Sequence, residues 1–238
     1  MSNLDFVFES IIHFALKDPR QTGLGRSIVK NGIYLIAELG FEEMNFKKLG
    51  KAIGSPEASI YRYFENKHKY LLYIMAMYWG IIDQHCEKII QSNKSHEEKL
   101  SSILDLLCTS PDISYGSEKI PGDVIYAIVI GESVKTFMTK HVDTDNTHGA
   151  FRTLKSTTSH IAQLLSEYSP DYPFPKALAS TIIEMSLYHR YFSEHLPSMT
   201  DIGKEQSIVD DLKQWIIGLL RATRITNGEE SQNFRISL

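Results

Sequence analysis

Apolar residues recur along most of the chain at intervals of three and four, which is the spacing of one face of an α-helix. Runs that alternate apolar and polar residues beside Asn-Gly or Asp-Gly pairs, the usual sign of hairpin strands, are nearly absent. The pattern therefore predicts an all-α protein. The segments expected to be helical are 5–16, 26–39, 46–53, 57–63, 67–92, 96–109, 122–140, 146–168, 176–195 and 204–223.

Residues that cap or break helices lie between these segments. Asn45 and Asn66 precede their helices as N-caps, and Gly40 follows a helix as a C-cap would. Gly54-Ser55-Pro56 breaks the chain sharply. Further breaks are expected over 110–122, 169–175 and 196–203, and the polar tail 227–238 is expected to be mobile.

The segment from Asn45 to Phe64 has the layout of a helix-turn-helix, in which the second helix enters the major groove of DNA. Its first short helix has one apolar face, made by Phe46, Leu49 and Ile53, and the second has a matching face from Ile60 and Phe64. Short helix pairs around a glycine also occur in all-α proteins that do not bind DNA. The spacing alone leaves both interpretations open.

The face of the second helix away from the core carries small and polar residues, which can approach base edges and phosphates. Lysines near the helix N-termini add positive charge where backbone N–H groups also favour phosphate. The residues of this face are Glu57, Ala58, Ser59, Tyr61, Arg62 and Tyr63, and the lysines are Lys47, Lys48 and Lys67.

Composition narrows the class of protein. The 238 residues are 42% hydrophobic and 23% charged, with 14 Gly, 8 Pro and 2 Cys, which excludes collagen-like, disordered and disulfide-scaffold chains. Residues 1–72 carry ten Lys and Arg against eight Asp and Glu, whereas the rest carries fifteen against twenty-one, so only the front of the chain favours a polyanion. The longest apolar run, 70–82, is shorter than the roughly 20 residues of a membrane span. We expect a soluble cytoplasmic protein that makes no membrane contact.

The stretch 32–72 resembles the DNA-binding domain of TetR-family transcriptional regulators. The matching pieces are Ala37-Glu-Leu-Gly40-Phe41, Leu49-Gly-Lys-Ala-Ile-Gly54 and Ser59-Ile-Tyr61-Arg-Tyr63-Phe64-Glu-Asn-Lys67, of which the last is similar to the family's T-L-Y-x-Y-F-x-S-K signature. The chain departs from the family where I-A becomes Leu49-Gly50 and A-G-V-S becomes Ile53-Gly54-Ser55-Pro56. The resemblance covers about the first third of the chain.

The resemblance implies roles for individual residues. Asn45 would cap its helix and touch phosphate, Tyr61 and Lys67 would contact phosphate, and Tyr63 would pack and contact the DNA backbone. Residues 55–59 and Arg62 would face the bases, and Arg26 could add a contact. The resulting DNA-binding set is Asn45, Lys47, Lys48, Ser55, Glu57, Ala58, Ser59, Tyr61, Arg62, Tyr63 and Lys67.

The resemblance also implies a DNA-binding domain (25–72) and a helical domain (73–225) that binds a small molecule and dimerises, followed by a tail (226–238). The N-terminal extension (1–24) has an amphipathic pattern and is interpreted as a helix packed on the body. A DNA arm is the alternative, which the lack of a basic cluster disfavours. Tyr, Met and other apolar residues of the helical domain are candidates for a ligand pocket, although such residues more often form core. They are Tyr78, Trp79, Ile82, His85, Cys108, Tyr126, Ile130, Phe137, Met138, Leu164 and Tyr188.

Two late helices would pair with those of a second copy, because one helix-turn-helix reads only half of a site. The expected contact residues are Leu178, Ile182, Met185, Phe192, Ile208, Leu212, Trp215, Ile216 and Leu219, which could equally pack within one monomer. Glu132, inside the apolar run 124–137, is interpreted as a solvated-face residue, with a pocket acid as the alternative. The scattered histidines have no metal-ligand spacing, so no metal or cofactor is expected.

The sequence thus predicts a ligand-responsive transcriptional regulator that binds a palindromic DNA operator as a homodimer, with a repressor as the favoured interpretation. A small, largely apolar molecule would release it from the operator. No P-loop, G-x-G-x-x-G or G-x-S-x-G motif supports an enzyme, so no catalytic residue is proposed. The alternative is a TetR-like protein-interaction module without specific DNA binding, which Glu57 and the mild basic excess leave open.

Overall fold

The computed structural model describes residues 11–203 and 207–229, and the side chains of residue 13 and of 222–229 are excluded from that description. Contacts divide the described chain into two compact units. The first contains 11–85 and 109–157, and the second contains 86–108 and 158–203 with 207–229. The long helix α5 (Lys67–Ile90) contributes to both units. The predicted domain boundary at residue 72 falls within this helix, in the first unit.

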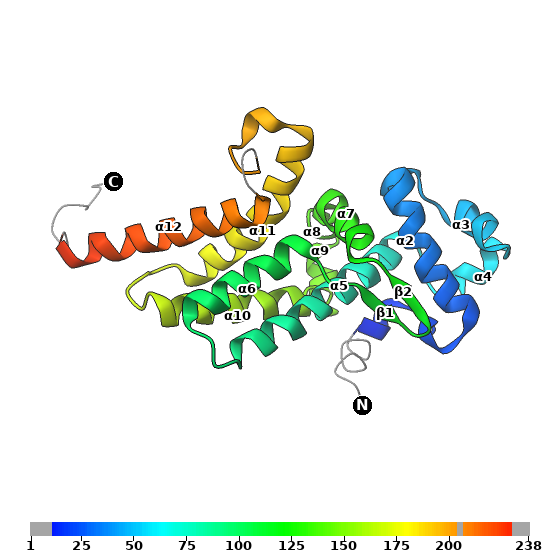
Figure 1. Ribbon diagram of the computed structural model, residues 1–238. Helices are drawn as coiled ribbons and strands as arrows, with labels where there is room; N and C mark the ends of the chain where they lie inside the picture. Colours follow the sequence, from blue (N-terminus) through cyan, green and yellow to red (C-terminus); the bar gives the residue numbers. More distant parts are fainter. Residues whose placement is uncertain (1–10, 204–206, 230–238) are drawn as a thin grey trace. The chain divides into compact units, whose positions relative to one another are not determined.

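The first unit begins with two 3-10 turns, η1 (Ile12–Phe14) and η2 (Pro19–Gln21), and continues with α2, α3, α4 and the first part of α5 (Figure 1). The helix bounds are α2 (Gly23–Glu43), α3 (Phe46–Ile53) and α4 (Glu57–Tyr61). Half of the helix predicted over 5–16 lies outside the described residues. Within them only 3-10 geometry follows Ile11, so the prediction was wrong for 12–16.

The apolar run 70–82 forms the centre of α5, and every one of its residues is buried. A helix that is apolar on all sides must be covered on all sides. Part of the cover comes from α2, whose Ile28, Val29 and Ile33 are fully buried. Among the described residues no helix is long and apolar enough to cross a membrane.

A β-hairpin stands where the sequence predicted a loop. Strands β1 (Ile113–Tyr115) and β2 (Glu118–Ile120) are antiparallel, with Ile113 opposite Ile120, and lie beside α2 (Figure 1). The turn needs Gly116, whose φ is 61°. Tyr115 is buried, and its hydroxyl lies 2.8 Å from that of Tyr73 on α5. Three-residue strands are too short to show a period-2 pattern in a sequence.

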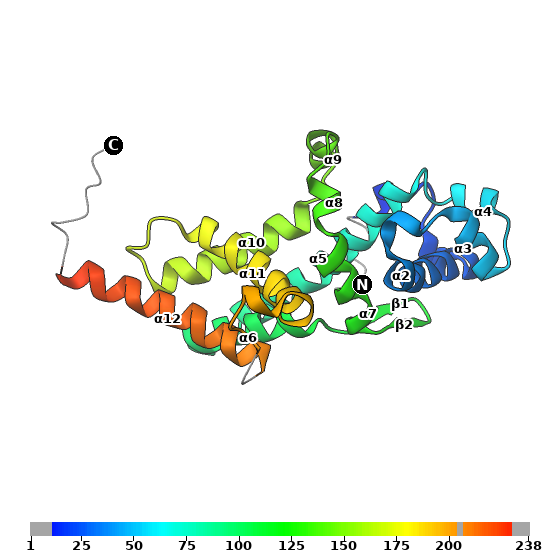
Figure 2. The ribbon, with the colours of Figure 1, turned by 90° about the horizontal axis from the view of Figure 1, so that it is seen from above.

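Two of the predicted long helices are interrupted. The helix predicted over 122–140 is α7 (Gly122–Glu132) followed by α8 (Val134–Phe137) (Figure 2). The one predicted over 146–168 is α10 (Arg152–Tyr168), preceded by a separate helix α9 (Val142–Thr147) that lies mostly before the predicted start. Gly149, with φ of 84°, ends α9 because a left-handed residue cannot continue the helix. Asp145 on α9 is buried and binds Lys69 and His68 at the start of α5.

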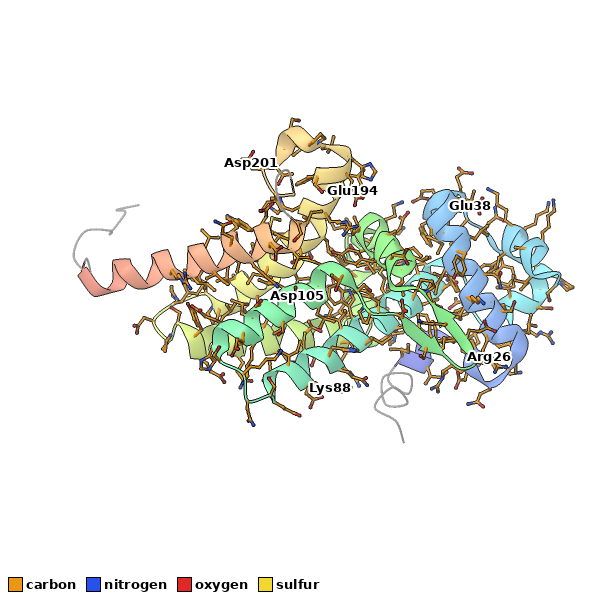
Figure 3. All side chains as sticks on the ribbon, in the orientation of Figure 1. Arg26, Glu38, Lys88, Asp105, Glu194 and Asp201 are labelled. Atoms are coloured by element: carbon orange, nitrogen blue, oxygen red, sulfur yellow. The ribbon has the colours of Figure 1, made fainter. Side chains whose placement is uncertain are left out.

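The second unit contains α6 (His96–Thr109), α11 (Pro175–His195) and α12 (Ile208–Glu229), together with the ends of α5 and α10. Charged residues such as Lys88 and Asp105 point outward from these helices (Figure 3). Lys213 of α12 pairs with Asp105 of α6 at 2.6 Å. The tail was predicted to start at 226, but 226–229 still belong to α12. The remainder of that tail lies outside the described residues.

Candidate nucleic-acid interface

The two short helices α3 and α4 form the helix-turn-helix that the sequence predicted. The Asn45 side chain caps α3 by accepting a hydrogen bond from the Lys48 amide at 2.9 Å. Gly54 ends α3 in the left-handed conformation, with φ of 65°, and Pro56 precedes α4. Each capping residue acts within a few positions of its own place in the chain, which is why the sequence showed these bounds. The helix predicted over 57–63 is shorter, since α4 ends at Tyr61.

Gly50 explains one departure from the family pattern. The turn folds back so closely on α3 that a Cβ at this position would lie 2.7 Å from the Ser55 carbonyl oxygen and 3.3 Å from the Glu57 nitrogen. The Ser55 amide also donates to the Gly50 carbonyl at 2.9 Å. The contacting atoms belong to the backbone, so they cannot rotate away as a side chain would. Gly50 therefore permits a tighter turn than alanine would.

Replacing Gly50 with alanine is expected to lower the free energy of unfolding by up to about 2 kcal/mol. Overpacking against backbone costs about 1–3 kcal/mol, and the better helix propensity of alanine returns about 1 kcal/mol. Urea denaturation would measure the change. The matched control is Gly131→Ala on α7, where a Cβ meets nothing within 4 Å. If Gly50→Ala were as stable as that control, the close approach of the turn would be contradicted.

Aromatic residues hold the two short helices on the unit. Phe46, Leu49, Ile60 and Phe64 are buried as predicted, whereas Ile53 is half-buried. The Tyr70 ring of α5 meets both Phe46 and Phe64 edge to face, with centroids 6.4 Å and 5.0 Å apart. Edge-to-face pairs add specific geometry to the apolar contact. This packing fixes α3 and α4 against α5.

The outer face of this pair is basic and accessible. The exposed residues of the predicted set are Asn45, Lys47, Lys48, Ala58, Tyr61 and Arg62, and Ser55, Glu57, Ser59 and Lys67 are half-buried. Exposed Lys51, absent from the predicted set, lies one helical turn beyond Lys47, a spacing that could have identified it. In the part of the chain that the structure describes, nothing pairs with the head groups of Lys47, Lys51 or Arg62. These cations are available to a polyanion.

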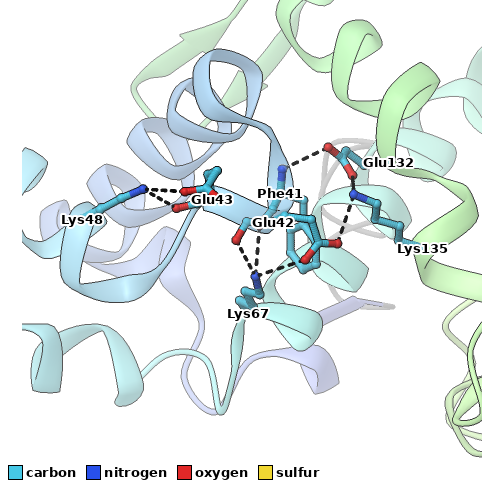
Figure 4. A network of polar contacts seen from close by, with 7 residues as sticks. All are labelled: Phe41, Glu42, Glu43, Lys48, Lys67, Glu132 and Lys135. Atoms are coloured by element: carbon cyan, nitrogen blue, oxygen red, sulfur yellow. Dashed lines mark hydrogen bonds and ion pairs between the residues drawn. The ribbon is translucent and has the colours of Figure 1, made fainter.

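Two of the predicted phosphate contacts have intramolecular partners instead. The Lys48 ammonium donates to the Glu43 carbonyl oxygen at 2.7 Å. The Lys67 ammonium donates to the carbonyl oxygens of Phe41 and Glu42, at 3.2 Å and 3.1 Å, and lies over the Phe41 ring (Figure 4). Both lysines therefore bind carbonyls at the C-terminal end of α2, where a cation is favourable. Their contact with DNA stays a prediction.

Tyr63 is buried rather than presented to DNA. Its hydroxyl lies 2.6 Å from the Thr22 hydroxyl, and its carbonyl accepts from the Leu16 amide at 2.7 Å. The packing role implied by the resemblance fits this position, whereas a contact with the DNA backbone does not. Arg26 likewise donates to the Arg20 carbonyl at 2.8 Å. The segment 14–22 thus packs on the end of the helix-turn-helix, and packing of the N-terminal extension on the body stays a prediction.

Glu132 is not the solvated-face residue that the sequence analysis favoured. Its side chain is only 12% exposed, and it accepts a hydrogen bond from the Phe41 amide at 3.0 Å. Its other oxygen pairs with Lys135 at 2.8 Å, and this hydrogen bond raises the pKa of the lysine. An acid inside an otherwise apolar run is the signal that marked this position. Only the fold shows its partner.

The predicted pocket residues are divided between the two units, and their role stays a prediction. In the first unit Tyr78, Trp79, Ile82 and Tyr126 are buried, while His85, Ile130 and Phe137 are half-buried. In the second unit Cys108 and Leu164 are buried and Tyr188 is half-buried. Burial raises the pKa of the Cys108 thiol to about 11. Met138 is 74% exposed, so it does not line an enclosed pocket.

The predicted dimer residues fall into two groups within the second unit. Ile182, Leu212 and Ile216 are buried in the monomer, whereas Trp215 and Leu219 on α12 are exposed. The half-buried members are Leu178, Met185, Phe192 and Ile208. The monomer alternative therefore holds for the first group, and pairing with a second copy stays a prediction for the others. The described residues contain no group of three His, Cys, Asp or Glu that could hold a metal ion.

Solved structures of transcriptional regulators share this fold. AibR in complex with isovaleryl coenzyme A and operator DNA matches with a TM-score of 0.55 at 15% identity, over 82% of this chain and 96% of its own. The fatty acid degradation regulator FadR from Bacillus halodurans matches with a TM-score of 0.55 at 18% identity, over 82% and 95%. A TetR/AcrR-type transcriptional regulator from Aquifex aeolicus VF5 matches with a TM-score of 0.51 at 14% identity. The match covers 83% of this chain and 97% of the regulator.

No protein-family model and no curated protein matches the sequence. The chain has the fold of TetR/AcrR-family transcriptional regulators, and the predicted all-α architecture is confirmed apart from the hairpin. These structural neighbours are regulators rather than enzymes.

Proposed function

We propose that this protein is a DNA-binding transcriptional regulator whose operator affinity responds to a small, largely apolar molecule, most simply as a repressor. The observation that carries the proposal is the exposed basic surface of the helix-turn-helix on a TetR/AcrR fold, where Lys47, Lys51 and Arg62 have no partner in the described part of the chain. Exposed cations release counterions from DNA, which gives affinity, and small residues such as Ala58 allow α4 to approach base edges.

A homodimer on a palindromic operator is the arrangement that this helix-turn-helix favours. One copy reads a half-site, and two-fold pairing places a second recognition helix about one turn of DNA away, roughly 34–36 Å. The exposed Trp215 and Leu219 of α12 support a contact between copies. An effector that binds one arrangement of the dimer better than another would change operator affinity by that difference. The structural neighbour AibR was solved in complex with both isovaleryl coenzyme A and operator DNA.

Binding to DNA can be tested by selecting duplexes from a random library and measuring anisotropy at several salt concentrations. Lys47→Ala is expected to weaken binding to all sequences and to reduce the salt slope by about 1, because one phosphate contact is lost. Arg62→Ala is expected to cost about 1–3 kcal/mol on the selected duplex and less on random DNA, because a base contact is lost.

The matched control is Lys88→Ala, since Lys88 is an exposed lysine in the last turn of α5, away from α3 and α4 in the sequence. It should leave the salt slope unchanged. If the wild type selected no duplex and bound random DNA without salt dependence, the chain would instead be an interaction module that retained the fold. An equal loss of DNA affinity in Lys47→Ala, Arg62→Ala and Lys88→Ala would contradict the assignment of α3 and α4 as the interface.

A further inference from the structure

Helix α2 is broken three residues before its end. Gly40 has φ of 77° and ψ of 159°, a conformation that L side chains rarely adopt. The break deprives the Phe41 amide of its place in the helical hydrogen-bond series, and the end of α2 at Glu43 leaves the carbonyls of residues 41–43 without helical partners. The short segment Phe41–Glu43 is therefore held by other parts of the first unit, not by α2 alone.

The amide released by the break is bound by α7. The Glu132 carboxylate accepts the Phe41 N–H at 3.0 Å and lies 3.8 Å from the position of a Cβ on Gly40 (Figure 4). Lys135, on α8, bridges Glu132 at 2.8 Å and Glu42 at 3.2 Å. The two residues beside the junction of α7 and α8 thus bind both the backbone and a side chain of the segment Phe41–Glu43.

The carbonyls at the end of α2 are bound by α5 and α3. Lys67 holds those of Phe41 and Glu42, and Lys48 holds that of Glu43. Glu43 is two residues from Asn45, the cap of α3. A shift of Phe41–Glu43 would therefore be passed directly to the start of α3, and the aromatic packing would carry α4 with it.

We propose that Glu132 is a positioning residue that sets the placement of α3 and α4 relative to α7, and through it the half-site spacing that the dimer accepts. The inference rests on the proposed function. The physical argument is that glycine at position 40 is a pivot with few steric limits, and Glu132 is the group that binds the chain immediately after the pivot. Without this bond the backbone of the segment is held only through its carbonyls, by Lys67 of α5 and Lys48 of α3, and its link to the α7–α8 side is reduced to the ion pair of Lys135 with Glu42.

The experiment compares dissociation constants of the wild type for the selected palindrome and for versions with one base pair added or removed between half-sites. Glu132→Ala removes the acceptor of the Phe41 amide. The ratio compared is the affinity for the selected palindrome divided by the affinity for a duplex of altered spacing. Glu132→Ala should reduce this ratio by about fivefold, as expected for loss of a charge-assisted hydrogen bond. Glu132→Gln retains an amide oxygen that can accept this hydrogen bond, and should recover most of the ratio.

The matched control is Asp123→Asn, an exposed acid in the first turn of the same helix, which should keep the wild-type ratio. A merely structural role for Glu132 would lower affinity equally at all spacings and leave the ratio unchanged, which would overturn the inference. An unchanged ratio with unchanged affinity would also overturn it. Failure of the wild type to select any duplex would contradict the proposed function itself, and this inference with it.

Discussion

Replacing Gly32 with alanine should lower the free energy of unfolding by about 3 kcal/mol, the upper end of the usual cost of overpacking. A Cβ on Gly32 would lie 2.1 Å from the Tyr70 hydroxyl oxygen and 2.6 Å from its Cζ. Tyr70 cannot move aside, because its ring contacts Phe46 and Phe64 and its hydroxyl donates to the Val29 carbonyl at 2.8 Å. Thermal and urea unfolding would both report the loss.

Two further variants separate the clash from other effects of the alanine. Gly218→Ala, on α12, adds a Cβ that meets nothing within 4 Å, and should be neutral or stabilising by up to about 1 kcal/mol. Tyr70→Phe in the Gly32→Ala background removes the oxygen nearest to the new methyl group, and should recover part of the stability. An equal effect of alanine at positions 32 and 218 would show that α2 and α5 do not approach as closely as described.

Loss of the buried Asp145 carboxylate is the second large effect that we expect. Burial opposes ionisation, but the hydrogen bonds from Lys69 and His68, at 2.7 Å and 2.9 Å, outweigh it and hold the pKa of Asp145 below its usual 3.8. Asp145→Asn should destabilise the protein at pH 7 by about 2 kcal/mol, the usual worth of hydrogen bonds to a charged group. The partly exposed lysine can be rehydrated, which keeps the cost below that of a fully buried pair.

The effect of Asp145→Asn on stability should depend on pH, in the direction set by the lowered pKa of the carboxyl. A carboxyl whose pKa is lowered by folding stabilises the native state above its unfolded pKa, and that stabilisation is lost as the pH falls through the folded value. The difference in the free energy of unfolding between wild type and Asp145→Asn should therefore have its full size at pH 7 and shrink below about pH 4. Urea midpoints measured across this range would show it. Asp143→Asn, an exposed neighbour on α9, is the control. A difference that did not shrink in acid would contradict the ion pair.

Sequence reasoning located the helices well wherever the determining residues lie close together. The bounds of α3 and α6 agree with the predicted ones, and the caps at Asn45 and Asn66 are present. It failed over the hairpin 113–120, where three-residue strands are stabilised by a distant partner, Tyr73. It also missed the break after Glu132, because apolar residues continue beyond this short interruption, and the break at Gly149, whose left-handed conformation the residue pattern does not show.

What the sequence by itself determined is the helical architecture, the helix-turn-helix between Asn45 and Phe64, and the basic character of its outer face. These follow from interactions that span a few residues, namely helical periodicity, capping and glycine turns. Only the tertiary structure decided which charges remain available on that face. Lys67 binds a carbonyl 26 residues away, Glu132 an amide 91 residues away, and Tyr63 a threonine 41 residues away. No local pattern shows such pairs, because packing of distant segments brings them together.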